Sequence, residues 1–182
     1  VSDAFGMLRQ VLESGTADKV LAGGVTGILF QMAQGVSFGT VQEQFLKDRS
    51  LHGFIKQAEG FLEKHSASFV CPVDFAYQDG DTRAEAHISK LPQDQLYTDI
   101  GRQSIGLFKS EIAKAGTIFV NGPMGAYENP LLSLGTDTIW NAMAEAPGYT
   151  VVGGGDSVNA AYKFVTNPED KFDYICTAGG AM

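Results

Sequence analysis

Residues 149–164, YTVVGGGDSVNAAYKF, decide the fold of this chain. The first four are aromatic or β-branched, and three glycines follow them. After Asp156 and Ser157, apolar side chains return at helical spacing, so the stretch predicts a strand, a glycine turn and a helix start. A helix start offers unpaired N–H groups and the positive end of a dipole, and glycine lets a bulky anion approach the backbone. We therefore expect this turn to hold the phosphate of a nucleotide.

The same unit of strand, turn and helix recurs along the chain. Apolar strands are predicted at residues 19–22, 68–71, 117–120, 149–152 and 173–176. Further helices are predicted at residues 5–14, 25–33, 52–64, 105–115 and 138–146, residues 36–50 are mixed, and residues 77–94 read as a polar excursion with one short strand near 85–88. Continuous apolar strands alternating with helices are typical of a parallel sheet covered on both faces. We expect one domain over residues 1–182 with a three-layer αβα, Rossmann-like fold.

Glycines cluster after four of the predicted strands. The clusters are Gly23 with Gly24, Gly122 with Gly125, Gly153 with Gly154 and Gly155, and Gly179 with Gly180. Because the carboxyl ends of parallel strands meet at one edge of a sheet, where ligands bind, the clusters indicate an extended anionic ligand. The chain contains neither G-x-x-x-x-G-K-[ST] nor a G-x-G-x-x-G after its first strand, so a P-loop fold and an ordinary dinucleotide fold are unsupported.

The composition limits the remaining classes of function. Hydrophobic residues make up 44% of the chain and charged residues 19%, which is typical of a globular protein. The formal net charge of −8 argues against nucleic acid as a partner, because nucleic-acid binding relies on basic patches. No stretch approaches the ~20 apolar residues of a membrane span and no signal peptide is visible. We expect a cytoplasmic protein without a membrane partner, in which Cys71 and Cys176 are reduced thiols.

Three motifs carry a resemblance to a known family. They are TIFVNGPMGAYE at residues 117–128, VVGGGDSVNAA at 151–161 and ICTAGGA at 175–181. With VSD at residues 1–3 and AGG at 22–24, they closely resemble the C-terminal, nucleotide-binding domain of phosphoglycerate kinase over essentially the whole chain. The resemblance implies an enzyme that moves a phosphoryl group between 1,3-bisphosphoglycerate and ADP with Mg²⁺. It also implies a separate N-terminal domain that holds phosphoglycerate.

The resemblance implies a role for each motif residue that faces the nucleoside. Gly23 and Gly24 would line the adenine slot. Asn121 and the turn that contains Pro123, Gly125 and Ala126 would lie along the nucleotide, and Glu128 would take the ribose hydroxyls.

The phosphate side of the site follows from the same resemblance. The amides of Gly153, Gly154 and Gly155, together with Ser157, would hold phosphate oxygens, and Asp156 would bind Mg²⁺. Gly154, Gly179 and Gly180 would take part in the phosphoryl transfer itself. These residue types suit the reaction, because phosphoryl transfer needs positioning and charge stabilisation more than covalent chemistry from the protein.

The chain also departs from the family pattern. The strand and G-G-A-K that usually precede V-S-D are absent, so we expect the sheet to lack its first, central strand and to have a gap between two others. Ala4 stands where many members have Lys, Arg102 where Pro is usual, and Ala178 where a glycine is usual. Without the N-terminal domain, we expect the 182-residue chain to be inactive alone.

Simpler readings of the same residues stay open. The glycines before Asp156 could form only a tight turn, Asp156 could only cap a helix, and Glu128 could be a solvated loop acid. A nucleotide-binding module without catalytic activity is the alternative function, and a reductase using a nicotinamide cofactor is a more distant one.

Overall fold

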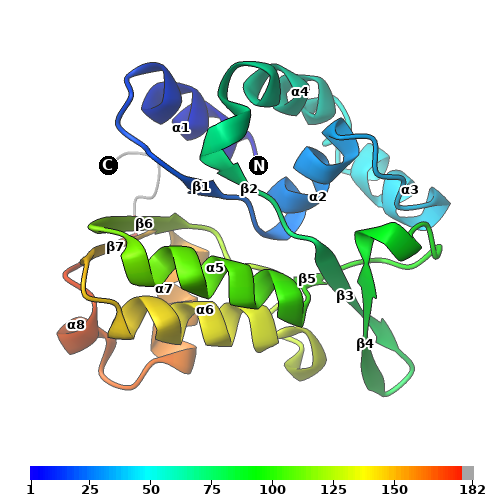
Figure 1. Ribbon diagram of the computed structural model, residues 1–182. Coiled ribbons are helices and arrows are strands. Elements are labelled where there is room, and N and C mark those ends of the chain that lie inside the picture. The colour runs from blue at the N-terminus through cyan, green and yellow to red at the C-terminus, as the bar shows by residue number, and fades with distance from the viewer. Residues whose placement is uncertain (178–182) are drawn as a thin grey trace.

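The computed structural model describes residues 1–177, and its helices alternate with short strands (Figure 1). The α-helices are α1 (Ser2–Glu13), α2 (Gly24–Ala33), α3 (Thr40–Asp48), α4 (Phe54–His65), α5 (Arg102–Lys114), α6 (Leu134–Glu145), α7 (Gly155–Phe164) and α8 (Pro168–Lys171). The strands are β1 (Val20–Leu21), β2 (Phe69–Val70), β3 (Asp74–Asp79), β4 (Thr82–His87), β5 (Asp99–Ile100), β6 (Thr117–Asn121), β7 (Tyr149–Gly153) and β8 (Tyr174–Cys176). Short 3₁₀ turns lie at Ser66–Ser68, Ile88–Lys90 and Pro130–Leu132.

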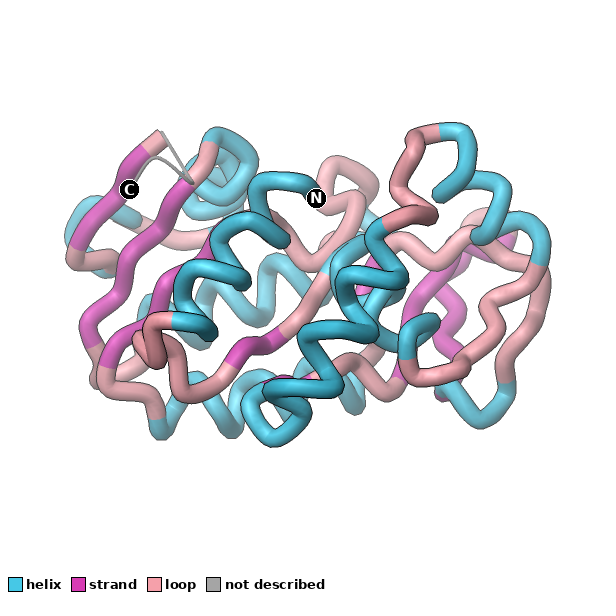
Figure 2. Tube along the Cα trace, turned by 90° about the horizontal axis from the view of Figure 1, so that it is seen from above, coloured by secondary structure: helices cyan, strands magenta, loops and turns pink. Residues whose placement is uncertain are grey.

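The five predicted apolar strands are confirmed and pair in parallel. β1 pairs with β2, and β6, β7 and β8 form a second sheet in that order. Seen from above, the strands of the second sheet run side by side at one end of the molecule (Figure 2). Among residues 1–177, the two parallel sheets are not hydrogen-bonded to each other, since there β1 pairs only with β2 and β6 only with β7. That a central strand is missing between two others stays a prediction.

Helices cover the strands in two layers, α1 and α4 on one side and α5 and α6 on the other (Figure 1). Neighbouring residues of β1 face different helix layers. Val20 packs with the core of α1, α2 and α4, whereas Leu21 packs with the core of α5, α6 and α7. In β2, Phe69 and Val70 divide between the same two cores. Side chains that alternate along a strand point to opposite faces, so the apolar runs end up buried on both sides. The three-layer α/β architecture is confirmed.

Two segments differ from the sequence-based expectation. The polar stretch 77–94 belongs to an antiparallel hairpin of β3 and β4, with β5 paired to the other edge of β3. A hairpin needs only one apolar face, so its polar outer residues read as a loop. The mixed stretch contains α3, whose buried residues are only Gln42 and Leu46. Its apolar stripe is therefore too narrow to mark a helix by periodicity.

No helix among residues 1–177 is long and apolar enough to cross a membrane.

Candidate functional site

The carboxyl ends of three parallel strands are level with one another. Asn121 at the end of β6 is in register with Gly153 of β7, and Gly153 is in register with Cys176 of β8. The turns that follow therefore leave the sheet at one edge. The amide of Gly154 donates to the carbonyl of Cys176 at 2.9 Å, which ties the turn after β7 to the end of β8.

The start of α7 is the main source of unsatisfied donors at this edge. Gly154 is the N-cap at φ +93°, a backbone conformation that favours glycine, and the first helical hydrogen bond runs from the amide of Val158 to the carbonyl of Gly154. The amides of Gly155, Asp156 and Ser157 therefore come before the first amide that donates within the helix, that of Val158. Gly155 and Asp156 are exposed. Solvent-facing amides at the positive end of a helix dipole suit an anion such as phosphate.

The carboxylate of Asp156 does not cap this helix. It lies in the first turn of α7, and α7 has no side-chain hydrogen bond at its N-cap. Asp156 is also exposed, so its carboxylate faces solvent at the start of α7. The capping alternative for Asp156 is therefore not what the structure shows.

The turn after β6 is held from three directions. The amide of Gly122 donates to Oγ of Ser157 at 2.6 Å, and that of Met124 donates to Oγ1 of Thr136 at 3.1 Å. The amide of Ala126 donates to the carbonyl of Thr98 at 2.8 Å. Alternate amides of residues 122–126 are thus fixed by α7, by α6 and by the segment before β5. A turn anchored in this way is preorganised, so little ordering is needed when a ligand binds.

Three glycines pack closely around this turn. A Cβ on Gly125 would collide with the carbonyl oxygen of Thr98. Gly24 has φ +59°, and a Cβ there would lie 3.0 Å from the carbonyl oxygen of Pro123. A Cβ on Gly23 would collide with the side chain of Met124. The first glycine cluster therefore lies directly against the turn after β6, although about 100 residues separate them in sequence.

Tyr127 lies between the two carboxylates that the sequence singled out. Its ring is buried, and its hydroxyl is 3.5 Å from the carbonyl oxygen of Asp156. Burial raises the pKa of Tyr127 above its usual range, and the negative charges of Asp156 and Glu128 raise it further. Nζ of Lys163 donates to the carbonyl of Tyr127 at 3.4 Å. Glu128 itself is exposed, at the same edge as Asp156.

With this geometry established, comparison with known proteins is informative. The family model for phosphoglycerate kinase matches residues 1–182. The chain belongs to the phosphoglycerate kinase family. Phosphoglycerate kinase of Methanopyrus kandleri is 35% identical over 182 residues, and that of Streptomyces coelicolor is 37% identical over 190 residues. Each match covers 100% of this chain but only 44% and 45% of the respective relative.

Solved structures of the family agree with the computed fold. The crystal structure of phosphoglycerate kinase from Pyrococcus horikoshii OT3 superposes with a TM-score of 0.91 at 30% identity, covering 100% of this chain and 45% of that one. The enzyme from Coxiella burnetii gives a TM-score of 0.85 at 30% identity, covering 100% and 46%. The chain therefore spans less than half the length of these phosphoglycerate kinases.

The structure brings most of the predicted site residues together at this edge of the fold. These are Gly23, Gly24, Asn121, Pro123, Gly125, Ala126, Glu128, Gly153, Gly154, Gly155, Asp156 and Ser157. Gly179 and Gly180 lie outside the described residues. Tyr127, Thr98 and Thr136 were not singled out from sequence. Tyr127 stands inside the NGPMGAYE motif, but nothing in the sequence spacing marks the two threonines.

Two of the predicted phosphate donors already have partners inside the protein. The Gly154 amide is bonded to Cys176, and Ser157 is buried with its hydroxyl on Gly122. Gly153 is buried in β7. Of the three glycine amides expected at the phosphate, that of Gly155 is the exposed one at the helix start. The exposed donors are therefore at the first residues of α7, not along the whole glycine run.

The donor set fits Mg²⁺ better than a transition metal. Among residues 1–177, no three His, Cys, Asp or Glu side chains group into a metal site. Mg²⁺ keeps several waters and takes its other ligands from one or two carboxylates and the substrate phosphates. The exposed carboxylate of Asp156, in the first turn of α7, is of the ligand type that Mg²⁺ takes.

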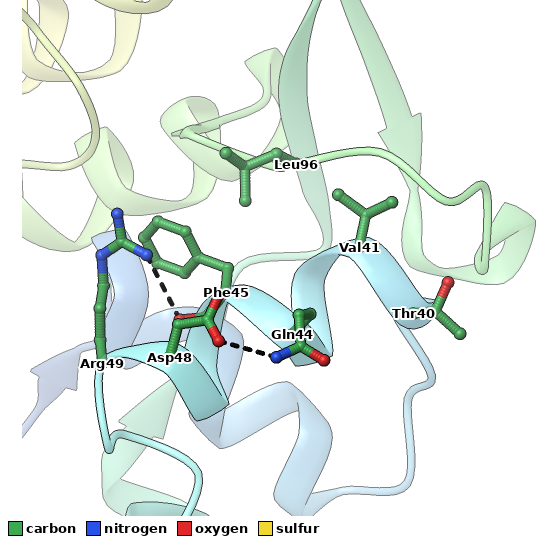
Figure 3. Close-up of a pocket in the computed structure, with 7 residues that line it drawn as sticks. All are labelled: Thr40, Val41, Gln44, Phe45, Asp48, Arg49 and Leu96. Atoms are coloured by element: carbon green, nitrogen blue, oxygen red, sulfur yellow. Dashed lines mark hydrogen bonds between the residues drawn. The ribbon is translucent and has the colours of Figure 1, made fainter.

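A separate depression of about 550 Å³ lies along α3 (Figure 3). Its lining residues are Thr40, Val41, Gln44, Phe45, Asp48, Arg49 and Leu96. The guanidinium of Arg49 stacks over the ring of Phe45 at 3.7 Å, and Gln44 donates to Asp48 at 2.7 Å. None of the predicted nucleotide residues lines this depression.

Proposed function

We propose that this chain supplies the magnesium–nucleotide half of a phosphoglycerate kinase. The enzyme would transfer a phosphoryl group reversibly between 1,3-bisphosphoglycerate and ADP, giving 3-phosphoglycerate and ATP. The observation that carries the proposal is the exposed start of α7 at the edge where the anchored turn 122–126 also ends, in a chain that the family matches from end to end.

The nucleoside would lie along the turn after β6. Gly23 and Gly24 pack against Pro123 and Met124. The backbone atoms of these two turns would line an adenine slot. The exposed carboxylate of Glu128 would accept hydrogen bonds from the ribose hydroxyls, as acidic residues do in other nucleotide folds.

The phosphates would lie at the start of α7. The amides of Gly155 and Asp156, the two exposed residues at this helix start, would donate to phosphate oxygens. Asp156 would hold Mg²⁺, which would supply charge neutralisation of the phosphate oxygens during transfer. Fixed donors of this kind stabilise developing charge without reorganising, and this is the main protein contribution to phosphoryl transfer. Gly179 and Gly180 would face the transferring group.

Turnover would need a second, phosphoglycerate-binding half. The relatives are more than twice as long as the stretch that matches this chain, which covers 44% of the Methanopyrus kandleri enzyme. Catalysis of in-line transfer depends on bringing both substrates into position. A chain of 182 residues that binds only the nucleotide is therefore expected to be inactive alone. We propose that the enzyme is cytoplasmic.

A nucleotide-binding module without activity is the second candidate, because the chain matches less than half of each relative. The two candidates differ in one assay. Addition of a phosphoglycerate-binding half of the family should restore ATP formation from 1,3-bisphosphoglycerate and ADP if the chain is half of an enzyme. A binding module would stay inactive in that mixture.

Calorimetric titration of Mg·ADP into the 182-residue chain tests the site itself. Asp156→Asn and Glu128→Gln should each weaken binding roughly tenfold or more, as expected for the loss of a charged partner. Asp170→Asn is the matched control, because Asp170 is also an exposed acid in the first turn of a helix. The proposal would be contradicted if binding of Mg·ADP were undetectable. Equal affinity in the unaltered chain and the three variants would contradict it as well. Titration of NADH in parallel separates this site from a reductase site.

A further inference from the structure

The side chain of Ser157 points toward the turn after β6 and not toward solvent. It belongs to the first turn of α7, yet only 1% of its surface is exposed. Its Oγ accepts the hydrogen bond from the amide of Gly122 at 2.6 Å, across 35 residues of sequence. Its carbonyl accepts from Nε1 of the buried Trp140 at 3.0 Å. The hydroxyl and the carbonyl of Ser157 are thus directed into the protein.

The partner of this hydroxyl, Gly122, has open space around it at the entry of the turn after β6. Gly122 has φ +96°, and a Cβ placed on it would meet nothing within 4 Å, so side-chain packing does not hold it. The other two anchored amides of the turn are fixed by Thr136 and Thr98. The hydroxyl of Ser157 is the anchor that joins the entry of the turn to the start of α7.

We propose that Ser157 is a positioning residue that couples the turn 122–126 to the phosphate-binding start of α7. Its hydroxyl does not contact a phosphate. The inference rests on the proposed nucleotide site, but it assigns the side chain to the nucleoside side of that site. The side chain is buried against Gly122, with 1% of the residue's surface exposed, so it does not face the solvent side of the helix start.

A positioning role for the Ser157 hydroxyl and direct binding of phosphate by it predict different results. A hydroxyl that bound phosphate would affect ADP and leave adenosine, which has no phosphate, untouched. A hydroxyl that holds the turn affects both ligands by the same factor. In Ser157→Ala we expect adenosine and Mg·ADP each to bind about 5-fold more weakly, the fold-change that corresponds to one lost hydrogen bond.

Nuclear magnetic resonance gives a readout that needs no nucleotide. In the unaltered chain, the amide proton of Gly122 should resonate downfield and exchange slowly, because its bond to Ser157 is short. Ser157→Ala should move that resonance upfield and accelerate its exchange. Ser157→Thr keeps the hydroxyl and should restore both the resonance and the adenosine affinity. Ser157→Cys, which keeps the volume but has a weaker acceptor, serves if the alanine variant does not fold.

Ser133→Ala is the control, since the Ser133 hydroxyl is exposed and bonds only locally to the carbonyl of Pro130. It should leave both affinities unchanged. Loss of Mg·ADP affinity in Ser157→Ala or Ser157→Cys with adenosine affinity intact would overturn the positioning role, and so would an unchanged Gly122 resonance. If the unaltered chain binds neither ligand, the proposed nucleotide site fails first. That outcome is separate, because the Gly122 resonance still reports whether the serine bond exists.

Discussion

Arg83 and Asp99 form a buried ion pair that ties the antiparallel hairpin to the α/β part of the fold. Nη1 of Arg83 lies 2.7 Å from Oδ2 of Asp99, whose side chain is fully buried. The same carboxylate accepts from the amide of Gly135 at the start of α6 and from that of Ile100. The Arg83 guanidinium also donates to the carbonyls of Ile100 and Leu131. One residue pair thereby joins β4, β5 and α6 beside the anchored turn.

Removal of Asp99 should therefore be costly. Asp99→Ala removes the fully buried carboxylate partner of Arg83, leaves only the partly exposed Glu85 carboxylate beside the guanidinium, and removes the acceptor of two amides. We expect the free energy of unfolding to fall by about 3 kcal/mol, as measured by urea denaturation. Glu111→Ala is the control, because the pair of Glu111 with Lys114 is at the surface and 4.0 Å apart. It should change stability by less than about 0.5 kcal/mol. Equal effects of the two substitutions would contradict the role given to Asp99.

A methyl group on Gly125 should disturb both stability and ligand binding. Its Cβ would collide with the Thr98 carbonyl and approach the Cα of Asp99, both of them backbone atoms that cannot rotate away. Gly125→Ala should lower the free energy of unfolding by roughly 1–3 kcal/mol and weaken nucleotide binding. Gly106→Ala is the matched control in α5, where a Cβ meets nothing within 4 Å. Thermal unfolding should show Gly106→Ala to be neutral or stabilising, by up to about 1 kcal/mol. A neutral Gly125→Ala would show that the turn can shift.

The thiol of Cys71 should react slowly. Burial raises the pKa of Cys71 from 9.0 to about 11, although a hydrogen bond with Gln34 opposes the shift. In a Cys176→Ser background at pH 8, modification by a disulfide reagent should be at least ~10-fold slower in the folded chain than in the urea-unfolded chain. The raised pKa also predicts that stability falls as the pH rises from 9 to 11, because the unfolded thiol loses its proton first. Equal rates of modification in the folded and unfolded chains would contradict the buried thiol.

Trp140 should report on nucleotide binding by fluorescence. It is the single tryptophan, it is fully buried, and its Nε1–H donates to the carbonyl of Ser157 in the first turn of α7. A charged ligand at that helix start should change the emission intensity of Trp140 without exposing it. Asp156→Asn should lose this response at Mg·ADP concentrations that saturate the unaltered chain, while keeping the red shift on unfolding. A response of equal size in Asp156→Asn would place the ligand elsewhere.

The parallel part of the fold could be predicted because its signals are local. A strand buried on both faces is apolar throughout, as at Val151 and Val152, and a glycine run marks its carboxyl end. Of the hairpin, only a short strand near residues 85–88 was predicted, which overlaps β4. Strand β3 and helix α3 were not predicted, because half-buried elements show weaker patterns. The ion pair of Arg83 with Asp99 joins residues 16 apart and left no motif in the sequence.

From the sequence alone, the units of strand, turn and helix could be recognised, with glycines expected at the carboxyl edge of the strands, because periodicity and glycine placement are properties of short stretches. The sequence also singled out Asp156 and Glu128, which the fold leaves exposed at that edge. Only the tertiary structure decided that the Ser157 hydroxyl turns inward to Gly122 and that the Gly154 amide is used by Cys176. The physical reason is that a hydrogen-bond partner is chosen by the packing of α7 against β6 and β8. That packing brings together residues far apart in the chain and buries their polar groups, which must then be satisfied within the protein.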